Sequence, residues 1–248
     1  MTKYLSSLVK DFTVFEKCLI AANILLSMVF LIMWYDSGNW YWMWFNVPII
    51  EYVAFISSIA NTISVILVAK RRIDNYPWGL VAVSTYAAVG FAYGNTAVWT
   101  FQLAWYLPLI VIGWLFWSKN KSKRDTRTVE AKKMNLLQSI AVYSLTLAGI
   151  FAFAWLISLP QVSIFLYGYE QDFGFDKHFI DAASDILAIP AMILMVKRYR
   201  EQWLFWILLN VFCIVLWSFY TFNPIMIVLW CTLLVNAAYG YCKWKVEV

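Results

Sequence analysis

The chain has 248 residues, of which 63% are hydrophobic and only 13% charged, and its formal net charge is +5. A soluble domain would carry about 25% charged residues, so this composition excludes an ordinary soluble protein. Apolar segments of roughly 17–25 residues, long enough to cross a bilayer, recur along the chain. They do not alternate in polarity, which argues against a membrane β-barrel. We therefore expect an all-α polytopic membrane protein, whose topology explains the net charge without a nucleic-acid partner.

Eight membrane-spanning helices are expected, in chain order. They cover residues 18–35, 48–69, 78–93, 97–117, 135–159, 178–196, 203–221 and 223–242. The third and the eighth are short, and they can span if flanking Tyr and Trp side chains lie in the membrane interface. The chain then divides into an N-terminal part with one extra helix (1–47), a three-helix bundle (48–117), a loop and linker region (118–177) and a second three-helix bundle (178–248).

The positive residues predict the orientation, because cytoplasmic loops of membrane proteins carry an excess of Lys and Arg. With the N-terminus inside, all but one of the 19 Lys and Arg residues fall in cytoplasmic segments, and only Lys177 lies outside. The outer loop 160–177 instead carries Glu170, Asp172 and Asp176. Both chain termini are therefore expected in the cytoplasm.

An internal repeat becomes visible when the sequence is aligned with itself at an offset of 127 residues, which places Lys70 on Lys197, Arg71 on Arg198, Gly113 on Gly240 and Trp117 on Trp244. Because both basic turns lie inside, the two halves are parallel copies of three helices. Parallel copies require a linker helix, and the span 135–159 supplies it. Such a pair of bundles is typical of a transporter with a substrate site between the bundles near mid-membrane. Chance similarity between apolar helices is the alternative.

Several chemistries lack the residues that they would need. The chain has a single histidine, His178, and its four cysteines show no C-x-x-C spacing, so we expect no metal centre. The sequence has no Gly-rich phosphate-binding loop followed by Lys-Ser or Lys-Thr, and no pairing of a nucleophile with a base stands out. We therefore expect no catalytic residue, no cofactor and no enzymatic activity.

Motifs in both halves resemble the PnuC family of nicotinamide riboside transporters, over residues 48–245. They are the turn Ile73-Asp74-Asn75-Tyr76, Gly113-Trp114 with Trp117, Asp181, Ala191-Met192-Ile193-Leu194-Met195, Lys197, Tyr199, Glu201, Trp203, Trp206, Asn210 and Asn236. The resemblance implies a SWEET-like plan of three, one and three helices, with the span 18–35 as an optional extra helix. It also implies a homotrimer in the bacterial inner membrane. That protein would import nicotinamide riboside for NAD synthesis by facilitated diffusion, and a cytoplasmic kinase would trap the substrate as its phosphate.

The candidate substrate site centres on Trp203, Trp206 and Asn210, whose spacing of three and four residues puts them on one helix face. Asn210 lies about 10 Å deeper than Trp203 at 1.5 Å per residue. An amide suits ribose hydroxyls and a carboxamide, and an indole face attracts the cationic pyridinium that the resemblance implies. In the alternative reading the amide only joins helices, and the tryptophans belong to the interface belt.

Further residues are candidates for the lining of the pathway: Gln102, Asn236, Thr85, Ser184 and Asp181. Asn236 is expected at a depth similar to that of Asn210, and Gln102 in the outer half of its helix. Each amide could equally form hydrogen bonds that join neighbouring helices, without contacting a substrate. Asp181 and Asp185 share a helix face at the outer edge, where they either attract a cation or are simply solvated.

The candidate site residues, together with the substrate that the resemblance implies, favour a uniporter for a cationic nucleoside. Glu51, Asp181 and Asp185 are all expected within a turn or two of the outer membrane edge. No carboxylate, His or Lys is then left near mid-membrane for coupling to protons or sodium. The alternatives are a SWEET-like carrier of sugars or other nucleosides, a membrane enzyme, and a channel or receptor.

Overall fold

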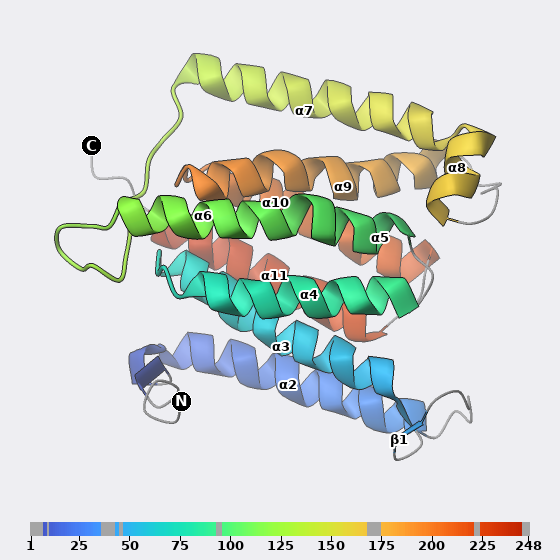
Figure 1. Cartoon of the computed structure of the whole chain (residues 1–248), viewed down its shortest axis with the longest axis horizontal. Coiled ribbons are helices and arrows are strands. Elements are labelled where there is room, and N and C mark those ends of the chain that lie inside the picture. Colours follow the sequence, from blue (N-terminus) through green and yellow to red (C-terminus); the bar gives the residue numbers. More distant parts are fainter. Residues whose placement is uncertain are drawn as a thin grey trace.

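The structure is a computed structural model and describes residues 7–8, 10–35, 43–44, 47–92, 96–167, 175–220 and 224–244 (Figure 1). The helical segments are α2 (Val14–Tyr35), α3 (Ile49–Ala69), α4 (Asn75–Ala92), α5 (Thr96–Phe101), the π-helical turn η1 (Gln102–Tyr106), α6 (Leu107–Lys119), α7 (Leu136–Ile157), α8 (Pro160–Tyr167), α9 (Phe175–Val196), α10 (Gln202–Val215), the π-helical turn η2 (Leu216–Tyr220) and α11 (Pro224–Lys243). A short antiparallel hairpin pairs β1 (Met43–Trp44) with β2 (Val47–Pro48). The expected outer-loop residues Glu170 and Asp172 lie outside the described residues.

Six of the described helical segments are long and apolar enough to cross a membrane. They are Ile49–Ala69, Val98–Lys119, Leu136–Ile157, Asp176–Val196, Gln202–Tyr220 and Met226–Lys243. The chain is therefore a multi-pass helical membrane protein, as the composition predicted. The other two expected spans, 18–35 and 78–93, lie largely in α2 and α4, which are not among these six.

Two elements differ from the sequence-based expectation. The expected loop 160–177 contains the helix α8, which begins at Pro160. A first-turn proline suits a helix start, because its missing N–H would have no partner there. Helix α9 begins at Phe175 rather than at 178, with Asp176 in its first turn. A carboxylate there is stabilised by the positive end of the helix dipole. The helix therefore begins about one turn earlier in the sequence than its apolar residues alone indicate.

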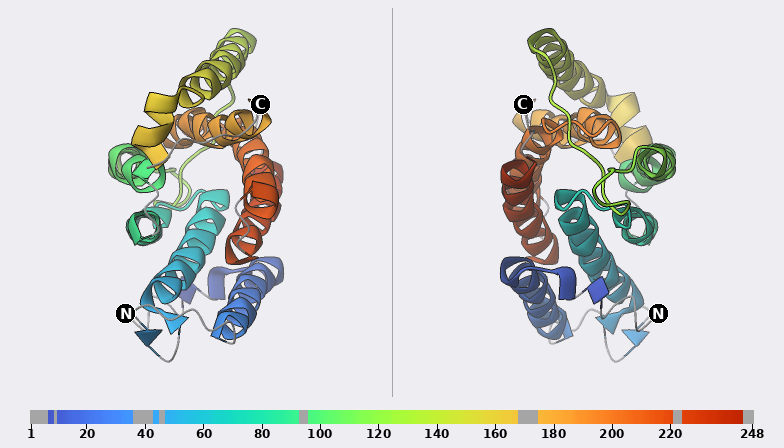
Figure 2. Two further views of the ribbon diagram at one scale, coloured as in Figure 1. Left: turned by 90° about the vertical axis from the view of Figure 1, so that its right-hand side faces the viewer. Right: turned by 90° about the vertical axis from the view of Figure 1, so that its left-hand side faces the viewer.

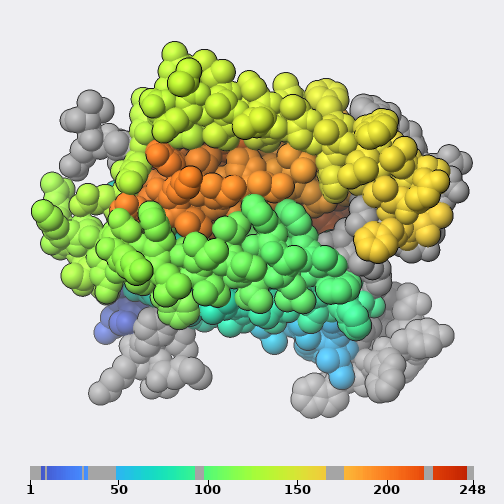
Figure 3. All heavy atoms as spheres, turned by 45° about the horizontal axis from the view of Figure 1, so that its top comes forward, coloured from blue at the N-terminus to red at the C-terminus, as the bar shows by residue number. Residues whose placement is uncertain are grey.

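The helices lie side by side along the long direction of the molecule (Figure 1). Helix α3 packs against α4 and α11, and α9 packs against α7, α10 and α6. Seen from the ends of the helices in Figure 2, α2 and α7 take opposite ends of the arrangement. In the space-filling view of Figure 3, α9 is visible between α7 and α6. Each of α3 and α9 therefore contacts helices from both halves of the sequence.

The two basic turns that follow α3 and α9 have the same backbone geometry. Arg71 and Arg198, which are 127 positions apart, both have a positive φ, 60° and 67° respectively. In each turn the next residue donates its N–H to the carbonyl five residues earlier, at 2.9 and 2.8 Å. This pattern satisfies carbonyl groups at a helix C-terminus. Positive φ is uncommon for residues other than glycine, so the agreement between the two turns extends to an unusual detail of the backbone.

The loop between α6 and α7 is hydrogen-bonded to both basic turns. Its Val129 N–H donates to the carbonyl of Arg71 at 3.0 Å, and its Lys132 N–H donates to the carbonyl of Arg198 at 2.7 Å. Val129 is 1% exposed and packs in a core cluster with residues from both halves of the chain. The loop thus connects the ends of α3 and α9.

Two buried tryptophans close the same end of the molecule. Trp117 in α6 donates from Nε1 to the carbonyl of Met195 in α9, and Trp244, directly after α11, donates to the carbonyl of Val68 in α3, both at 3.1 Å. Both residues are 0% exposed, and their ring centroids are 6.2 Å apart. The last carbonyls of a helix lack partners within the helix, so each indole satisfies a carbonyl of the other half of the chain.

Gly113 in α6 and Gly240 in α11 let an aromatic ring lie directly on the helix. A Cβ atom at Gly113 would lie 2.6 Å from Oη of Tyr76, and one at Gly240 would lie 2.5 Å from the ring of Trp203. No real side chain tolerates such distances, so the close approach of the two rings depends on glycine. Tyr76 and Trp203 are themselves 127 positions apart.

Candidate functional site

A cavity lies among α3, α4, η1, α6, α9, α10 and α11. It contains about 940 Å³ of space not filled by atoms, its open side included. Its polar lining residues are Asn61, Ser64, Asn75, Gln102, Asn210 and Asn236, and its aromatic lining residues are Tyr86, Tyr106, Trp203, Trp206 and Trp230. The rest of the described lining is aliphatic, Met, Ala or Gly, and no described lining residue is charged. An apolar wall with a few convergent polar groups is typical of a small-molecule site.

Two of the lining amide side chains are buried, and some or all of their polar atoms have no hydrogen-bond partner among the described residues. Asn210 is 2% exposed and Asn236 is 1% exposed. Within the described residues, Oδ1 of Asn210 and both polar side-chain atoms of Asn236 accept or donate no hydrogen bond. The indole Nε1 groups of Trp203 and Trp230 have no acceptor either. A buried polar group left unpaired costs about 1–3 kcal/mol, so these groups are well placed to bind a polar molecule in the cavity.

Other polar lining residues are already engaged in the fold. Ser64 donates to the carbonyl of Asn75 at 3.0 Å, and the Asn75 side chain donates to the carbonyl of Arg72 at 2.5 Å. These bonds connect α3 to the start of α4 at the wall of the cavity. Ser64 and Asn75 therefore contribute mainly to the structure of the turn, whereas Asn210 and Asn236 keep hydrogen-bonding capacity for a ligand.

The π-helical turn η1 positions two lining residues at its ends. Gln102 begins this turn and Tyr106 ends it, and both line the cavity. A π-turn inserts an extra residue into a helix and rotates the following side chains, and such turns often occur at functional sites. Pro108 follows the π-turn directly in the same helix, and local π adjustments accommodate the N–H that a proline lacks.

The cavity brings together five of the side chains that the sequence suggested as a site. They are Trp203, Trp206, Asn210, Gln102 and Asn236. Three of them come from α10, one from η1 and one from α11. The spacing argument for the α10 face, together with the search for amides inside spans, therefore identified residues that share one cavity.

Three other suggested residues are not among the residues that line the cavity. They are Thr85, Ser184 and Asp181. Thr85 donates its hydroxyl hydrogen to the carbonyl of Val81 at 2.7 Å, and Ser184 donates to the carbonyl of Asp181 at 2.7 Å. Ser and Thr hydroxyls inside helices commonly bond to the preceding turn in this way. Neither hydroxyl needs a ligand to satisfy it.

Some lining residues were missed by sequence reasoning. Asn61 in α3 is an amide inside an expected span, the same signal that pointed to Asn210, and it could have been found by that rule. Trp230 could have been found on α11, because its spacing of three and seven residues from the lining residues Leu233 and Ala237 follows one helix face. Tyr86 and Tyr106 resemble the many interface aromatics in the sequence and gave no separate signal.

Asp185, one of the carboxylates expected toward the outer membrane edge, lies near the middle of α9, which spans Phe175–Val196. Its carboxyl group lies near Tyr86 and Tyr106, which line the cavity, although Asp185 itself is not a lining residue. The structure therefore has a carboxyl group near the middle of a candidate membrane span, beside the cavity.

Comparisons with known proteins agree with this picture. Residues 49–246 match the family model described as nicotinamide mononucleotide transporter. A relative from Haemophilus influenzae, named nicotinamide riboside transporter PnuC, is 32% identical over 195 residues, which are 78% of this chain and 79% of that protein. A relative of the same name from Neisseria mucosa is 28% identical over 204 residues, which are 78% of this chain and 72% of that protein. The crystal structure of the vitamin B3 transporter PnuC superimposes with a TM-score of 0.69 at 25% identity, covering 94% of this chain and 91% of that one.

The family match covers most of the chain and includes every residue that lines the cavity. The relative with 32% identity extends over more than two thirds of both sequences. The chain therefore belongs to the PnuC family of membrane transporters.

Proposed function

We propose that this chain imports nicotinamide riboside across the bacterial inner membrane, with the substrate bound in the cavity between the two halves. The observation that carries the proposal is the pair of buried, unpaired amides of Asn210 and Asn236 beside the indoles of α10. Nicotinamide riboside offers a carboxamide and ribose hydroxyls, which complement amide groups. The relatives named as nicotinamide riboside transporters give the same substrate class.

The lack of charged side chains in the described lining of the cavity supports a nucleoside rather than a nucleotide as the substrate. The family model is described by the mononucleotide, whereas the relatives are named for the riboside. A phosphate group is normally bound by Arg, Lys or backbone N–H groups, and the described lining has no basic side chain. The pyridinium ring of the riboside is cationic, so indole faces such as that of Trp206 would attract it. Asp185 beside the cavity would add a negative charge at mid-membrane.

Architecture supports transport by alternating access. We interpret 48–117 and 178–248 as two parallel three-helix bundles, α7 as their linker and α2 as an extra N-terminal helix, which gives eight spans on a SWEET-like plan. The basic turns, the glycines and the end tryptophans that recur at an offset of 127 residues support this division. The abundance of Lys and Arg in these turns favours an orientation with both termini in the cytoplasm. A homotrimer remains the assembly that the family resemblance implies.

The tryptophan contacts then describe a state that is closed toward the cytoplasm. Trp117 and Trp244 each join one bundle to the other at the cytoplasmic end. Release of substrate into the cytoplasm would require at least one of these two hydrogen bonds to break. The transport cycle proposed here is therefore a movement of one bundle against the other around the cavity.

Facilitated diffusion without a coupling ion is the proposed driving mode, with phosphorylation in the cytoplasm trapping the substrate. Asp185 favours a second candidate, proton-coupled uptake, because carboxylates inside membranes often take part in proton relays. In the first mode Asp185 stays charged and balances the substrate cation. In the second it would take up and release a proton in each cycle.

Uptake of labelled nicotinamide riboside into proteoliposomes tests the substrate. We expect saturable uptake that unlabelled riboside inhibits and that glucose and nicotinamide mononucleotide inhibit weakly, since glucose lacks the cationic ring that the indole faces would attract, and the described lining has no basic side chain for a phosphate. Inhibition by the mononucleotide as strong as by the riboside would contradict the proposed selectivity. Absence of riboside uptake by folded protein would contradict the function itself.

A further inference from the structure

Helix α2 lies across the boundary between the two bundles. It packs against both α3 and α11 (Figures 1 and 2). Near the middle of α2, Asn23 accepts a hydrogen bond from Ser58 of α3 at 3.1 Å and donates one to Thr232 of α11 at 3.4 Å. Asn23 is 1% exposed. One side chain of α2 is therefore bonded to both bundles.

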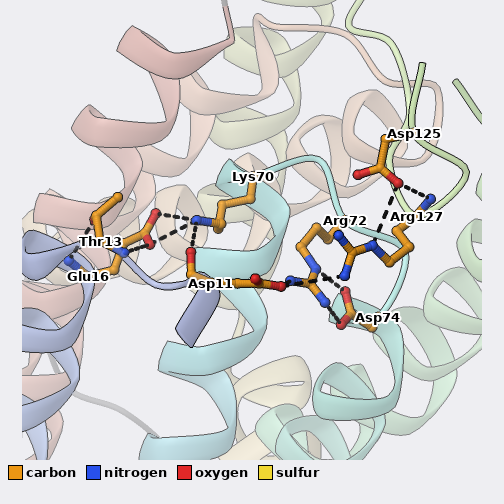
Figure 4. Close-up of polar contacts among 8 residues, drawn as sticks. All are labelled: Asp11, Thr13, Glu16, Lys70, Arg72, Asp74, Asp125 and Arg127. Atoms are coloured by element: carbon orange, nitrogen blue, oxygen red, sulfur yellow. Dashed lines mark hydrogen bonds and ion pairs between the residues drawn. The ribbon is translucent and has the colours of Figure 1, made fainter. Parts of the chain in front are cut away.

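Glu16 repeats this connection at the cytoplasmic end of α2. Its carboxylate pairs with Nζ of Lys70, at the end of α3, at 3.0 Å (Figure 4), and it accepts a hydrogen bond from Tyr239 of α11 at 2.9 Å. The Glu16 side chain is 0% exposed, whereas that of Lys70 is 22% exposed. A buried carboxylate is tolerated only when it is paired and hydrogen-bonded, so these contacts hold α3, α11 and α2 together.

The start of α2 makes Glu16 rigid. Thr13 N–H donates to the Glu16 carboxylate at 2.7 Å, and Glu16 N–H donates to the Thr13 hydroxyl at 3.3 Å (Figure 4). These reciprocal bonds form a capping box, which fixes both side chains at the first turn of a helix. Phe15, beside them, packs against the ring of Tyr239 with centroids 4.8 Å apart.

The residues before α2 fasten this end to the turn between α3 and α4. Leu8 and Phe12 are buried against Ile66 and Leu67. Asp11 pairs with Arg72 at 2.7 Å (Figure 4). Burial works to lower the pKa of Arg72, but the hydrogen bonds and charges of Asp74 and Asp11 outweigh it and raise that pKa. Arg72 therefore remains a charged anchor for the N-terminal segment.

Among the described residues, no helix is hydrogen-bonded through its side chains to both α6 and α9 at the opposite boundary in the way that α2 is bonded to α3 and α11. Helix α7 stands before α9 as α2 stands before α3, and it packs mainly on α9. In the described residues, the side-chain hydrogen bonds shown for α7, such as that from Thr146 to the carbonyl of Val142, stay within the helix and its caps. At its cytoplasmic end this boundary is held by Trp117 and by the bond from Arg198 to Asn120 Oδ1 at 3.1 Å.

We propose that α2 is a brace that keeps the α3–α11 boundary closed through the transport cycle, so that the bundles separate along the α6–α9 boundary. Glu16 and Asn23 are the two points at which the brace joins both bundles, and they lie seven residues apart, about 10 Å along the helix. The α3–α11 boundary then acts as the hinge. The inference rests on the proposed transport of nicotinamide riboside for its readout.

Cross-linking at the two boundaries tests the brace. In a background in which Cys18, Cys213, Cys231 and Cys242 are replaced, one variant carries Glu16→Cys and Tyr239→Cys, and the matched variant carries Asn120→Cys and Arg198→Cys. Each is treated in proteoliposomes with the same short bis-methanethiosulfonate reagent, and riboside uptake is compared before and after. We expect linkage at 16 and 239 to preserve uptake, and linkage at 120 and 198 to slow it roughly tenfold or more, because movement between conformations limits transport.

The remaining outcomes decide against the brace. Loss of uptake on linking 16 to 239 would mean that the α3–α11 boundary opens, and unchanged uptake on linking 120 to 198 would mean that the α6–α9 boundary does not. If Glu16→Cys prevents folding, Asn23→Cys with Thr232→Cys supplies a second pair between the same helices. Uptake by the unlinked variants and the cysteine-free parent is measured first. Absence of riboside uptake by these unlinked proteins would count against the transport function and not against the brace.

Discussion

Asn210 has a buried side-chain oxygen without a protein donor, on the wall of the cavity. Asn210→Ala should therefore weaken riboside binding by about 1–3 kcal/mol, the range for removing a partner from a buried polar contact. The measurement is the Kd of purified, folded protein. Thr85→Ala is the matched control and should leave the Kd unchanged, since the Thr85 hydroxyl bonds to its own helix outside the cavity. Equal affinities of Asn210→Ala and the parent would reduce Asn210 to a helix-packing residue.

Asp185 gives a second prediction at this scale, because in the proposed function its carboxylate balances the charge of the substrate cation. Asp185→Asn should weaken binding of the cationic oxidised riboside by roughly tenfold, or about 1.4 kcal/mol. The reduced dihydronicotinamide riboside is neutral, and its binding should change little. The comparison uses one variant and two ligands of nearly the same shape. If both ligands lose affinity equally, Asp185 supports the fold and does not balance the substrate charge.

Which of these residues could be predicted from sequence depends on how local their signal is. Asn210 and Asn236 stand out as amides inside apolar segments, and helical spacing then groups Trp206 with Asn210 on one face. The position of Asp185 within its helix was harder to predict, because the polar first turn of α9, which begins at Phe175, cannot be distinguished from a loop by hydropathy. The position of Gln102 on the cavity wall depends on the π-turn η1, which hydropathy and helical spacing do not reveal.

At the scale of elements, Gly240 allows α10 and α11 to approach through the ring of Trp203. A Cβ atom there would lie 2.5 Å from the ring, which is 2% exposed and cannot easily move. Gly240→Ala should therefore lower the free energy of unfolding by about 1–3 kcal/mol, as overpacking does. Thermal unfolding in detergent measures this. Gly149→Ala is the control, because its nearest neighbour would be a single side-chain methyl group at 3.3 Å, and it should cost less. Equal effects of the two substitutions would contradict the account of this contact.

The bond between Tyr239 and Glu16 belongs to the same scale, since it joins α11 to α2. Tyr239→Phe removes a hydrogen bond to a buried charged group, which should lower the free energy of unfolding by about 1.5–3 kcal/mol. In a Glu16→Ala background the same substitution should have almost no effect, because its partner is already gone. Additive effects of the two substitutions would show that the bond does not stabilise the folded protein.

The positions of the helices could be predicted from the sequence more readily than the contacts between them. The two basic turns could be aligned by their residues alone, because charged residues at the ends of apolar segments are easily recognised. Their bonds to Val129 and Lys132 could not, since the loop between α6 and α7 is polar and has no periodic pattern. The brace formed by Glu16 was also hidden, because a glutamate near the N-terminus is usually solvated, and only the folded structure brings Lys70 and Tyr239 to it.

For the whole molecule, the distribution of Lys and Arg predicts that the loop between α6 and α7 faces the cytoplasm. A single cysteine at Lys121, which is exposed in this loop, should react with an impermeant thiol reagent in inside-out vesicles and stay protected in right-side-out vesicles. Asp172 is expected on the outer side but lies outside the described residues. Labelling of position 121 only in right-side-out vesicles would reverse the proposed orientation.

The central claim is that the protein carries a cationic nucleoside through its cavity without a coupling ion. A unit charge that crosses 100 mV gains about 2.3 kcal/mol, or roughly fifty-fold in the equilibrium ratio. The most direct test is the final ratio of labelled nicotinamide riboside inside and outside kinase-free proteoliposomes at clamped membrane potentials. The account predicts equal concentrations at zero potential, whatever the pH or sodium gradient, and a ratio approaching fifty-fold at 100 mV, inside negative. Accumulation at zero potential driven by a proton gradient would contradict it and would identify Asp185 as the first residue to examine for coupling.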